Sequence, residues 1–180
     1  MISYPRSDAD NYKKIYIDKD GVPLIKLKDG YQYIRYKDCN IKTYEYIKRS
    51  QAETKTLRKK FDTSARKNFL KEIGENNIPD LQKAKFSNNE IKLIQEGKVP
   101  KGYQVHHKDS LDDNGTNDSH NLVLIKNEFA HTAITASQKS MTAGMKAGDK
   151  RLVDFVSPMD GIVVYPTDSK NVEIIKIDPL

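Results

Sequence analysis

The most constraining feature of this chain is the position of its histidines. The sequence of 180 residues contains four of them, His106, His107, His120 and His131, and all four lie between Gly102 and Thr135. Histidines scattered through a hydrophobic core would not cluster in this way. Imidazole is a common ligand of divalent metals and titrates near neutral pH. The cluster therefore predicts a site at which imidazoles surround a metal ion.

The residues around the histidines have the pattern of two strands followed by a helix. Strands are predicted at Tyr103–Lys108 and Asn121–Lys126, with Asn114-Gly115 as a tight turn inside the longer loop between them. Asn127 is predicted to cap a helix from Glu128 to Met141 that packs across both strands. The helix residues expected to face a core are Phe129, Ala130, Ala133 and Ile134. Residues 102–141 thus predict a ββα arrangement.

The spacing of the polar residues indicates two separate roles for His106 and His107. Adjacent residues of a strand point to opposite faces, so the two imidazoles diverge. One of them is expected to join His131 on a divalent metal, while the other stays off the metal and removes a proton from water. The metal would polarise a phosphoryl oxygen. Asn121 is predicted to tie the loop to the strand through hydrogen bonds to backbone groups. These parts together predict hydrolysis of phosphodiester bonds.

This stretch also resembles a known family. The residues that carry the resemblance are His106-His107, Asp113-Asn114-Gly115-Thr116-Asn117-Asp118, Asn121-Leu122-Val123-Leu124-Ile125 and His131. They are similar to the HNH/endonuclease VII superfamily of nucleases, and in particular to the HNH toxin domains at the C-termini of bacterial polymorphic toxins. Those include contact-dependent inhibition and type VI secretion effectors. The resemblance extends over Ser87–Gln104 and, more weakly, over Leu57–Ile73 and Val153–Pro166.

The resemblance implies roles for individual residues. His107 becomes the general base and Asn121 the residue that orients the loop, while His106 and His131 become metal ligands. Some relatives carry another histidine four residues after the helix histidine, where this chain has Thr135. The metal is then held by two histidines and water molecules, or with help from Asp109 or Asn127. A shell rich in water favours Mg²⁺, with Mn²⁺, Ni²⁺ and Zn²⁺ as alternatives.

The resemblance also implies a biological setting. It suggests an antibacterial toxin domain that is secreted or delivered, cuts DNA in the cytoplasm of the target cell and is neutralised by a cognate immunity protein. Little sequence specificity is expected because no helix-turn-helix or zinc finger is evident. Three alternatives stay open: a ribonuclease on the same fold, a non-catalytic nucleic-acid-binding module with a structural metal, and a housekeeping or phage HNH enzyme that has no immunity partner.

The charge distribution favours a polyanionic partner. The chain has a net charge of +6, and the excess is concentrated between Lys42 and Lys71. Such a stretch attracts nucleic acid through counterion release, although a solvated helix face would have the same composition. The basic residues predicted to contact nucleic acid are Lys59, Lys60, Arg66, Lys67 and, inside the motif, Lys108. No signal peptide and no membrane segment are predicted.

The rest of the chain is predicted to surround this motif in an α+β fold, a ββα-metal (HNH) core with flanking helices. Residues 1–50 are expected to form an N-terminal β-rich segment, with a β-meander over residues 12–47 that turns at Asp18–Gly21 and Lys28–Gly30. Residues 51–150 are expected to hold the helical support and the core, and residues 151–180 the C-terminal strands that pack on it. The predicted strands of this last segment are Leu152–Val156, Gly161–Tyr165 and Val172–Ile177.

Helix signals lie between the meander and the motif. Apolar residues at helical spacing predict a helix over residues 56–73 that ends at Gly74. The alternative is that a second, shorter helix starts at Asp62 or Thr63. Asn76–Phe86 is predicted to be a linker around Pro79. Ser87-Asn88-Asn89-Glu90 has the spacing of a capping box, which predicts a short helix through Glu96.

Overall fold

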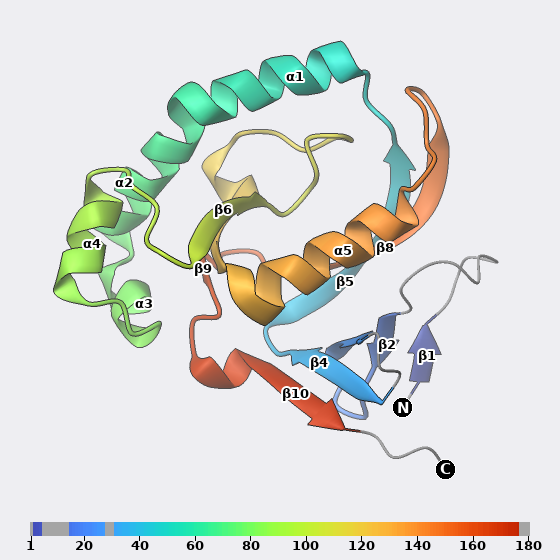
Figure 1. Cartoon of the computed structure of the whole chain (residues 1–180), viewed down its shortest axis with the longest axis horizontal. Coiled ribbons are helices and arrows are strands. Elements are labelled where there is room, and N and C mark those ends of the chain that lie inside the picture. The colour runs from blue at the N-terminus through green and yellow to red at the C-terminus, as the bar shows by residue number, and fades with distance from the viewer. Residues whose placement is uncertain (1, 5–14, 28–30, 177–180) are drawn as a thin grey trace.

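The protein has an α+β fold, with three sheets and a set of helices packed against them (Figure 1). The structure, a computed structural model, describes residues 2–4, 15–27 and 31–176. Residues 12–14 of the predicted meander, the predicted turn at 28–30 and Ile177 lie outside these ranges. Within them, no helix is both long enough and apolar enough to cross a membrane.

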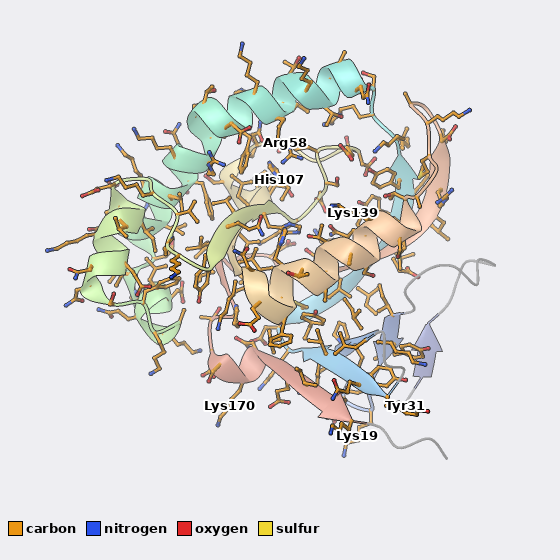
Figure 2. The ribbon with its side chains drawn as sticks, in the orientation of Figure 1. Lys19, Tyr31, Arg58, His107, Lys139 and Lys170 are labelled. Atoms are coloured by element: carbon orange, nitrogen blue, oxygen red, sulfur yellow. The ribbon has the colours of Figure 1, made fainter. Side chains whose placement is uncertain are left out.

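The first sheet joins the two ends of the chain. Its hydrogen-bonded order is β1 (Ile2–Tyr4), β2 (Ile15–Ile17), β3 (Pro23–Lys26), β4 (Gln32–Tyr36) and β10 (Val172–Lys176). The β2–β3–β4 part is the predicted meander, and β10 is the last strand predicted from the sequence. Figure 2 places Lys19 and Tyr31, which belong to this region, at the part of the molecule farther from His107.

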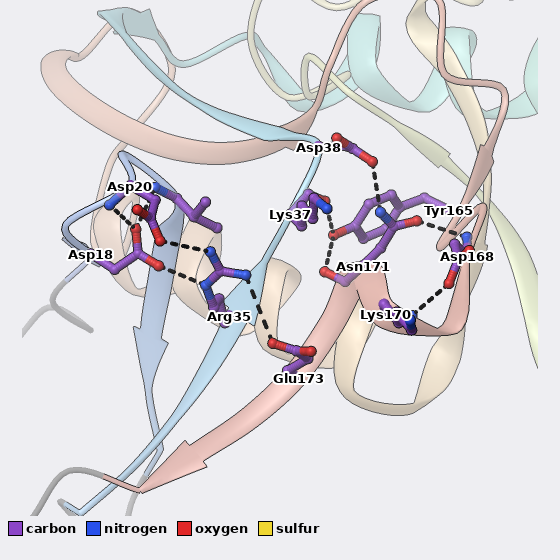
Figure 3. Close-up of polar contacts among 11 residues, drawn as sticks. Asp18, Asp20, Arg35, Lys37, Asp38, Tyr165, Asp168, Lys170, Asn171 and Glu173 are labelled. Atoms are coloured by element: carbon purple, nitrogen blue, oxygen red, sulfur yellow. Dashed lines mark hydrogen bonds and ion pairs between the residues drawn. The ribbon is translucent and has the colours of Figure 1, made fainter.

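Polar contacts hold β10 beside β4 (Figure 3). Arg35 on β4 pairs with Asp18 at 2.6 Å on one side and with Glu173 on β10 at 3.7 Å on the other. The buried Tyr165 hydroxyl donates to the carbonyls of Lys37 and Asn171, at 2.8 and 3.2 Å. These bonds cross between strands that are far apart in sequence, so they fix the C-terminal strand on the N-terminal meander.

A long two-stranded ribbon forms the second sheet. β5 (Cys39–Ile47) pairs antiparallel with β8 (Lys150–Pro158) along the whole length of both strands. The apolar side of the ribbon carries Tyr46, Val153 and Phe155, which form a small core of their own. β8 is longer than the predicted strand Leu152–Val156 because β5 offers partners for residues on both sides of that range.

The third sheet contains the histidine pair. β6 (Tyr103–His107) runs antiparallel to β7 (Leu122–Lys126), and β7 runs parallel to the short β9 (Val164–Tyr165). Both faces of β7 are buried: Val123 and Ile125 pack with α5, and Leu122 and Leu124 pack with the other helices. A strand covered on both sides reads as an unbroken apolar run, which explains the sequence Leu-Val-Leu-Ile.

The predicted helix over residues 56–73 is part of a longer helical rod. Ser50 caps α1 (Gln51–Lys60), a π-helical turn η1 (Phe61–Ala65) follows, and α2 (Arg66–Asn76) completes the rod. The chain stays helical through the π turn, with αR backbone angles at Lys60 and Arg66, so no break occurs at Asp62 or Thr63. The prediction that Gly74 ends the helix is wrong, because Gly74 lies inside α2. A Cβ there would come within 2.9 Å of Gln95 on α4, so the glycine permits close helix packing.

Two short helices connect the rod to β6. The predicted linker Asn76–Phe86 contains α3 (Ile78–Lys83), which the sequence analysis missed. The capping box predicted at Ser87 is present, with Ser87 and Glu90 bonded reciprocally at the start of α4 (Asn88–Gln95). Two 3₁₀ turns, η2 (Ser119–Asn121) and η4 (Ser169–Asn171), precede β7 and β10.

The helix after the motif begins later than predicted. η3 (Asn127–His131) is irregular, with Phe129 at φ 61°, and α5 (Thr132–Met141) follows. The prediction that the Asn127 side chain caps the helix is wrong, because its Oδ1 accepts from Gln104 Nε2 at 2.5 Å. Phe129 was expected to face a core and is exposed instead, since its positive φ turns it outward. Ala130, Ala133 and Ile134 are buried as expected.

Candidate functional site, a histidine-lined cavity

The alternation of β6 separates His106 from His107, as their adjacent positions predict. His107 shares a face with Val105, which packs in the core formed with α2, α3 and α4. His106 shares the other face with Gln104 and meets His131 from η3, with ring centroids 5.0 Å apart and planes at 79°. The strand therefore directs one imidazole to a second histidine and the other to the helical rod.

The ring of His107 is held by its neighbours. It is buried, packs against Phe61 of η1 at 4.5 Å between centroids, and places Nε2 2.9 Å from Asn117 Oδ1. The amide nitrogen of Asn117 donates to the Leu57 carbonyl at 2.9 Å, which fixes the oxygen towards His107. His107 Nε2 must then carry the hydrogen, so Nδ1 is left with a free lone pair. That atom is available to accept a proton.

His131 is fixed through both of its ring nitrogens. Gln104 Nε2 lies 2.6 Å from His131 Nδ1 and also donates to Asn127 Oδ1. Thr135 Oγ1, one helical turn further along α5, lies 3.0 Å from His131 Nε2. Thr135 lies at the position where the resemblance described above allows a histidine, and its hydroxyl contacts the imidazole from there.

Three of the four histidines open into one cavity of about 300 Å³. Its walls come from β6, the 110–112 loop, α5, Arg58 of α1 and Tyr46 with Phe155 of the ribbon. In Figure 2, His107 lies between Arg58 on α1 and Lys139 on α5. The cavity is lined by Tyr46, Arg58, Gln104, Val105, His106, His107, Ser110, Leu111, Asp112, His131, Thr135, Gln138, Lys139, Thr142 and Phe155. His120 is exposed in η2 and does not line it.

Burial keeps these imidazoles neutral. It lowers the pKa of His106 to about 3, and the nearby His131 and His107 add to that effect. It lowers the pKa of His107 to about 4, against the opposing effect of the Asn117 hydrogen bond. The pKa of His131 is also lowered by burial, with a contribution from Lys139. At neutral pH each ring is therefore neutral, with one N–H and one lone pair, which is the state that metal ligation and proton acceptance both require.

Asn121 makes the hydrogen bonds that its place in the motif predicts. Its Oδ1 accepts from the Asp109 amide at 2.8 Å, and its Nδ2 donates to the carbonyls of Asp109 and Thr116 at 3.0 and 2.8 Å. The side chain is buried and does not line the cavity. Asn121 thus acts on the shape of the loop. Its catalytic importance stays a prediction.

The turn of this loop is closed at Ser110, before the Asn114-Gly115 pair at which it was predicted: the Ser110 carbonyl accepts from the amides of Asp113 and Gly115, at 3.1 and 3.0 Å. A Cβ on Gly115 would lie 2.0 Å from the Asp109 carbonyl oxygen, so the glycine is required by close backbone contact. Arg49, just before α1, donates to the carbonyls of Leu111 and Gly115 at 2.7 and 3.2 Å. The loop is therefore held from both Asn121 and Arg49.

The structure does not bring every predicted residue to the cavity. Asp109 pairs with Lys42 at 3.1 Å and lines a different cavity, so the structure does not bring it to the histidines as a metal ligand. Asn127 reaches His131 only through Gln104. Lys108 is buried and donates to the Met159 carbonyl, which removes it from any surface that contacts nucleic acid. Within the described ranges, no three His, Cys, Asp or Glu side chains converge as a metal-binding group.

The remaining basic residues lie along the rod. Lys59, Lys60 and Lys67 are exposed. Arg66 pairs with Asp62 at 3.3 Å and stands over the Phe61 ring, 5.5 Å from its centroid. These positions are compatible with contact to a polyanion, and their role stays a prediction.

The sequence analysis missed Gln104, Asn117 and Arg49. Gln104 had a signal, because a residue two places before His106 on a strand must share its face. Asn117 and Arg49 had none, since their partners, Leu57 and Leu111, become neighbours only after the rod packs over the loop.

Fold and cavity define an α+β protein in which a β-hairpin and a helix enclose a histidine-lined cavity. No family model and no solved structure matches the chain. Among curated proteins it is 36% identical over 163 residues to a protein of Escherichia coli (strain K12) named "Uncharacterized protein YhhZ". The match covers 89% of this chain and 38% of that protein, so the chain spans well under half the length of this relative.

Proposed function

We propose that this protein is a metal-dependent HNH endonuclease that hydrolyses phosphodiester bonds with little sequence specificity. The observation that carries the proposal is that the two adjacent histidines of β6 lie in different surroundings. His106 meets His131 on one face of the strand, and His107, on the other face and bonded to Asn117, also lines the cavity. A binding module would need no such third imidazole.

The residues present suit a sparsely held divalent ion. His106 and His131 would hold it, and their lowered pKa values keep both rings neutral. One nitrogen of His131 would exchange its present hydrogen bond, to Gln104 or to Thr135, for the ion. Because only two imidazoles meet here, water must complete the shell, which suits Mg²⁺, with Mn²⁺, Ni²⁺ and Zn²⁺ as alternatives. When bound, the ion would polarise a phosphoryl oxygen and stabilise the leaving oxygen.

His107 is the proposed general base. Its Nδ1 accepts the proton of a water molecule, while Asn117 holds the hydrogen on Nε2 and keeps the ring from turning. Phe61 packs against the ring at an interplanar angle of 57°. Asn121 acts one step away, because it holds the loop that carries Asn117 at its position.

The biological role belongs to the same proposal. The family resemblance favours an antibacterial toxin domain, secreted or delivered, that acts on DNA in the cytoplasm of a target cell and is neutralised by an immunity protein. RNA is the alternative substrate, because a positively lined cavity of this kind contacts phosphates, which both polymers share.

Digestion of supercoiled plasmid and of total RNA by the purified chain tests the proposal. Parallel reactions would contain Mg²⁺, Mn²⁺, Ni²⁺, Zn²⁺ or EDTA. We expect plasmid nicking that requires a divalent ion. Loss of RNA alone would retain the site and change the substrate. If neither polymer is cut under any of these conditions, the endonuclease proposal fails.

A further inference from the structure

Two cations stand on opposite walls of the histidine cavity. Arg58 comes from α1 and Lys139 from α5, and both side chains are exposed and line the cavity. Among the residues that the structure describes, the ion pairs involve neither of them, whereas Lys42, Lys48 and Arg66 each have a carboxylate partner. A pair of unneutralised cations facing one small cavity is suited to an anion.

A third group in the cavity lacks a partner. The amide nitrogen of Gln138 on α5, the residue before Lys139, is buried without a hydrogen-bond acceptor among the described residues. A buried donor without an acceptor destabilises the fold, so such groups usually have an acceptor in the functional state. A phosphate oxygen placed between Arg58 and Lys139 would supply one.

The cavity continues along the N-terminal half of α1. A second cavity, of about 650 Å³, shares Arg58 and Asp112 with the histidine cavity and adds Lys55 and Gln51. Gln51, Lys55 and Arg58 follow one another at intervals of four and three residues, so they lie on one face of the helix. This second cavity shares Lys48 and Arg49 with a third one beyond it.

We propose that this face of α1 is the track for the nucleic-acid backbone, which rests on the proposed endonuclease function. One phosphate binds between Arg58, Lys139 and Gln138 beside the histidines, and the strand continues past Lys55 towards Lys48. The track thus leaves the cavity towards the start of α1 and away from η1 and α2.

A matched control is available on the same helix. Lys59 and Lys60 are as exposed as Lys55 and Arg58, yet neither lines any of these three cavities. At 100° per residue they are rotated by about 100° and 200° from Arg58 around the helix axis. Removal of two charges from either pair changes the net charge equally, so a difference between the pairs reports position.

The experiment measures binding of a fluorescein-labelled single-stranded DNA of 16 nucleotides, and of its duplex, by anisotropy. EDTA prevents metal-dependent cleavage, and the NaCl concentration is varied. For Lys55→Gln/Arg58→Gln we expect weaker binding and a slope of log K against log[salt] that is shallower by about 1.4 to 1.8, which corresponds to two lost phosphate contacts. The track passes neither Lys59 nor Lys60, although the sequence predicted contact at both, so for Lys59→Gln/Lys60→Gln we expect a change in slope smaller than one contact, about 0.7.

A second variant tests the phosphate position independently of net charge. Gln138→Leu removes the unpartnered donor at similar volume, so we expect an unchanged or higher Tm together with weaker DNA binding. A lower Tm with unchanged binding would show a structural role for Gln138 and overturn this part of the proposal.

Equal effects of the Lys55/Arg58 and Lys59/Lys60 double variants on binding, or no effect of the Lys55/Arg58 variant, would overturn the track. Either result would point to another occupant such as an acidic protein. Absence of nucleic-acid binding by the unaltered chain would instead remove the proposed function itself.

Discussion

Asn121 is one of the two residues that hold the loop between β6 and β7, and Asn121→Ala tests its contribution. The side chain of Asn121 makes three hydrogen bonds to the backbone of Asp109 and Thr116. A buried hydrogen bond contributes about 1 kcal/mol net. Three of them predict a loss of about 3 kcal/mol in the free energy of unfolding, because no water-accessible group replaces the amide inside the loop.

For a chain of this size, that loss corresponds to a fall in Tm of about 6–12 °C. Differential scanning calorimetry would measure it. Asn114→Ala is the matched control: Asn114 lies in the same loop, is exposed, and is expected to change stability by less than about 0.5 kcal/mol. Asn121→Asp should also destabilise at neutral pH, because a carboxylate oxygen then faces two carbonyl oxygens.

The same variant separates loop geometry from chemistry. Asn121 lies outside the cavity, so its removal should slow cleavage only by loosening the loop that carries Asn117. If Asn121→Ala costs less than about 1 kcal/mol, or lowers Tm no more than Asn114→Ala does, the amide does not hold the loop and the argument is refuted.

Three further predictions follow from burial and packing. Folding lowers the pKa of His106 to about 3 and of His107 to about 4, so the unfolded chain binds protons first as the pH falls below about 6.5. Denaturant titrations should therefore show a free energy of unfolding that decreases from pH 7 to pH 5, by at most about 1.4 kcal/mol per pH unit per group. A free energy that does not change with pH in this range would contradict the burial of these rings. Gly74→Ala should lower the free energy of unfolding by about 1–3 kcal/mol, measured by urea denaturation, since the new Cβ would lie 2.9 Å from the Gln95 backbone. An unchanged free energy would mean that α2 and α4 can move apart without loss of stability. A divalent ion that binds only the folded chain should raise Tm, and His106→Ala should remove that rise; an equal rise in the variant would place the ion elsewhere.

Much of the local structure could be predicted from the sequence because it depends on neighbours along the chain. The capping box at Ser87 and the Asp18–Gly21 turn rest on contacts within a few residues. The two strands of the motif pair over 15 to 23 residues, from His107 with Leu122 to Tyr103 with Lys126, but each is marked in the sequence by its own pattern. The divergence of His106 and His107 also follows from strand geometry alone. The capping box, the turn and the divergence of the two histidines do not depend on contacts with the rest of the chain.

Features that depend on distant packing were missed or misassigned. Gly74 reads as a helix end and is instead a contact point with Gln95, which lies 21 residues away. Lys108 reads as a surface cation and is buried under the turn at Met159. Asn127 was predicted to cap a helix, but its side-chain oxygen accepts a hydrogen bond from Gln104 instead. Each of these outcomes is decided by a partner that only the tertiary fold supplies.

The most direct test of the account is the rate of plasmid nicking by His107→Ala, in whichever divalent ion supports the unaltered chain. Because His107 lies off the His106–His131 pair, we expect its loss to leave the fold and the metal-induced rise in Tm in place. Cleavage should fall by about 10²–10⁴, the usual contribution of a general base. Near-native cleavage by His107→Ala would contradict the assignment of the base, and with it the reading of the cavity.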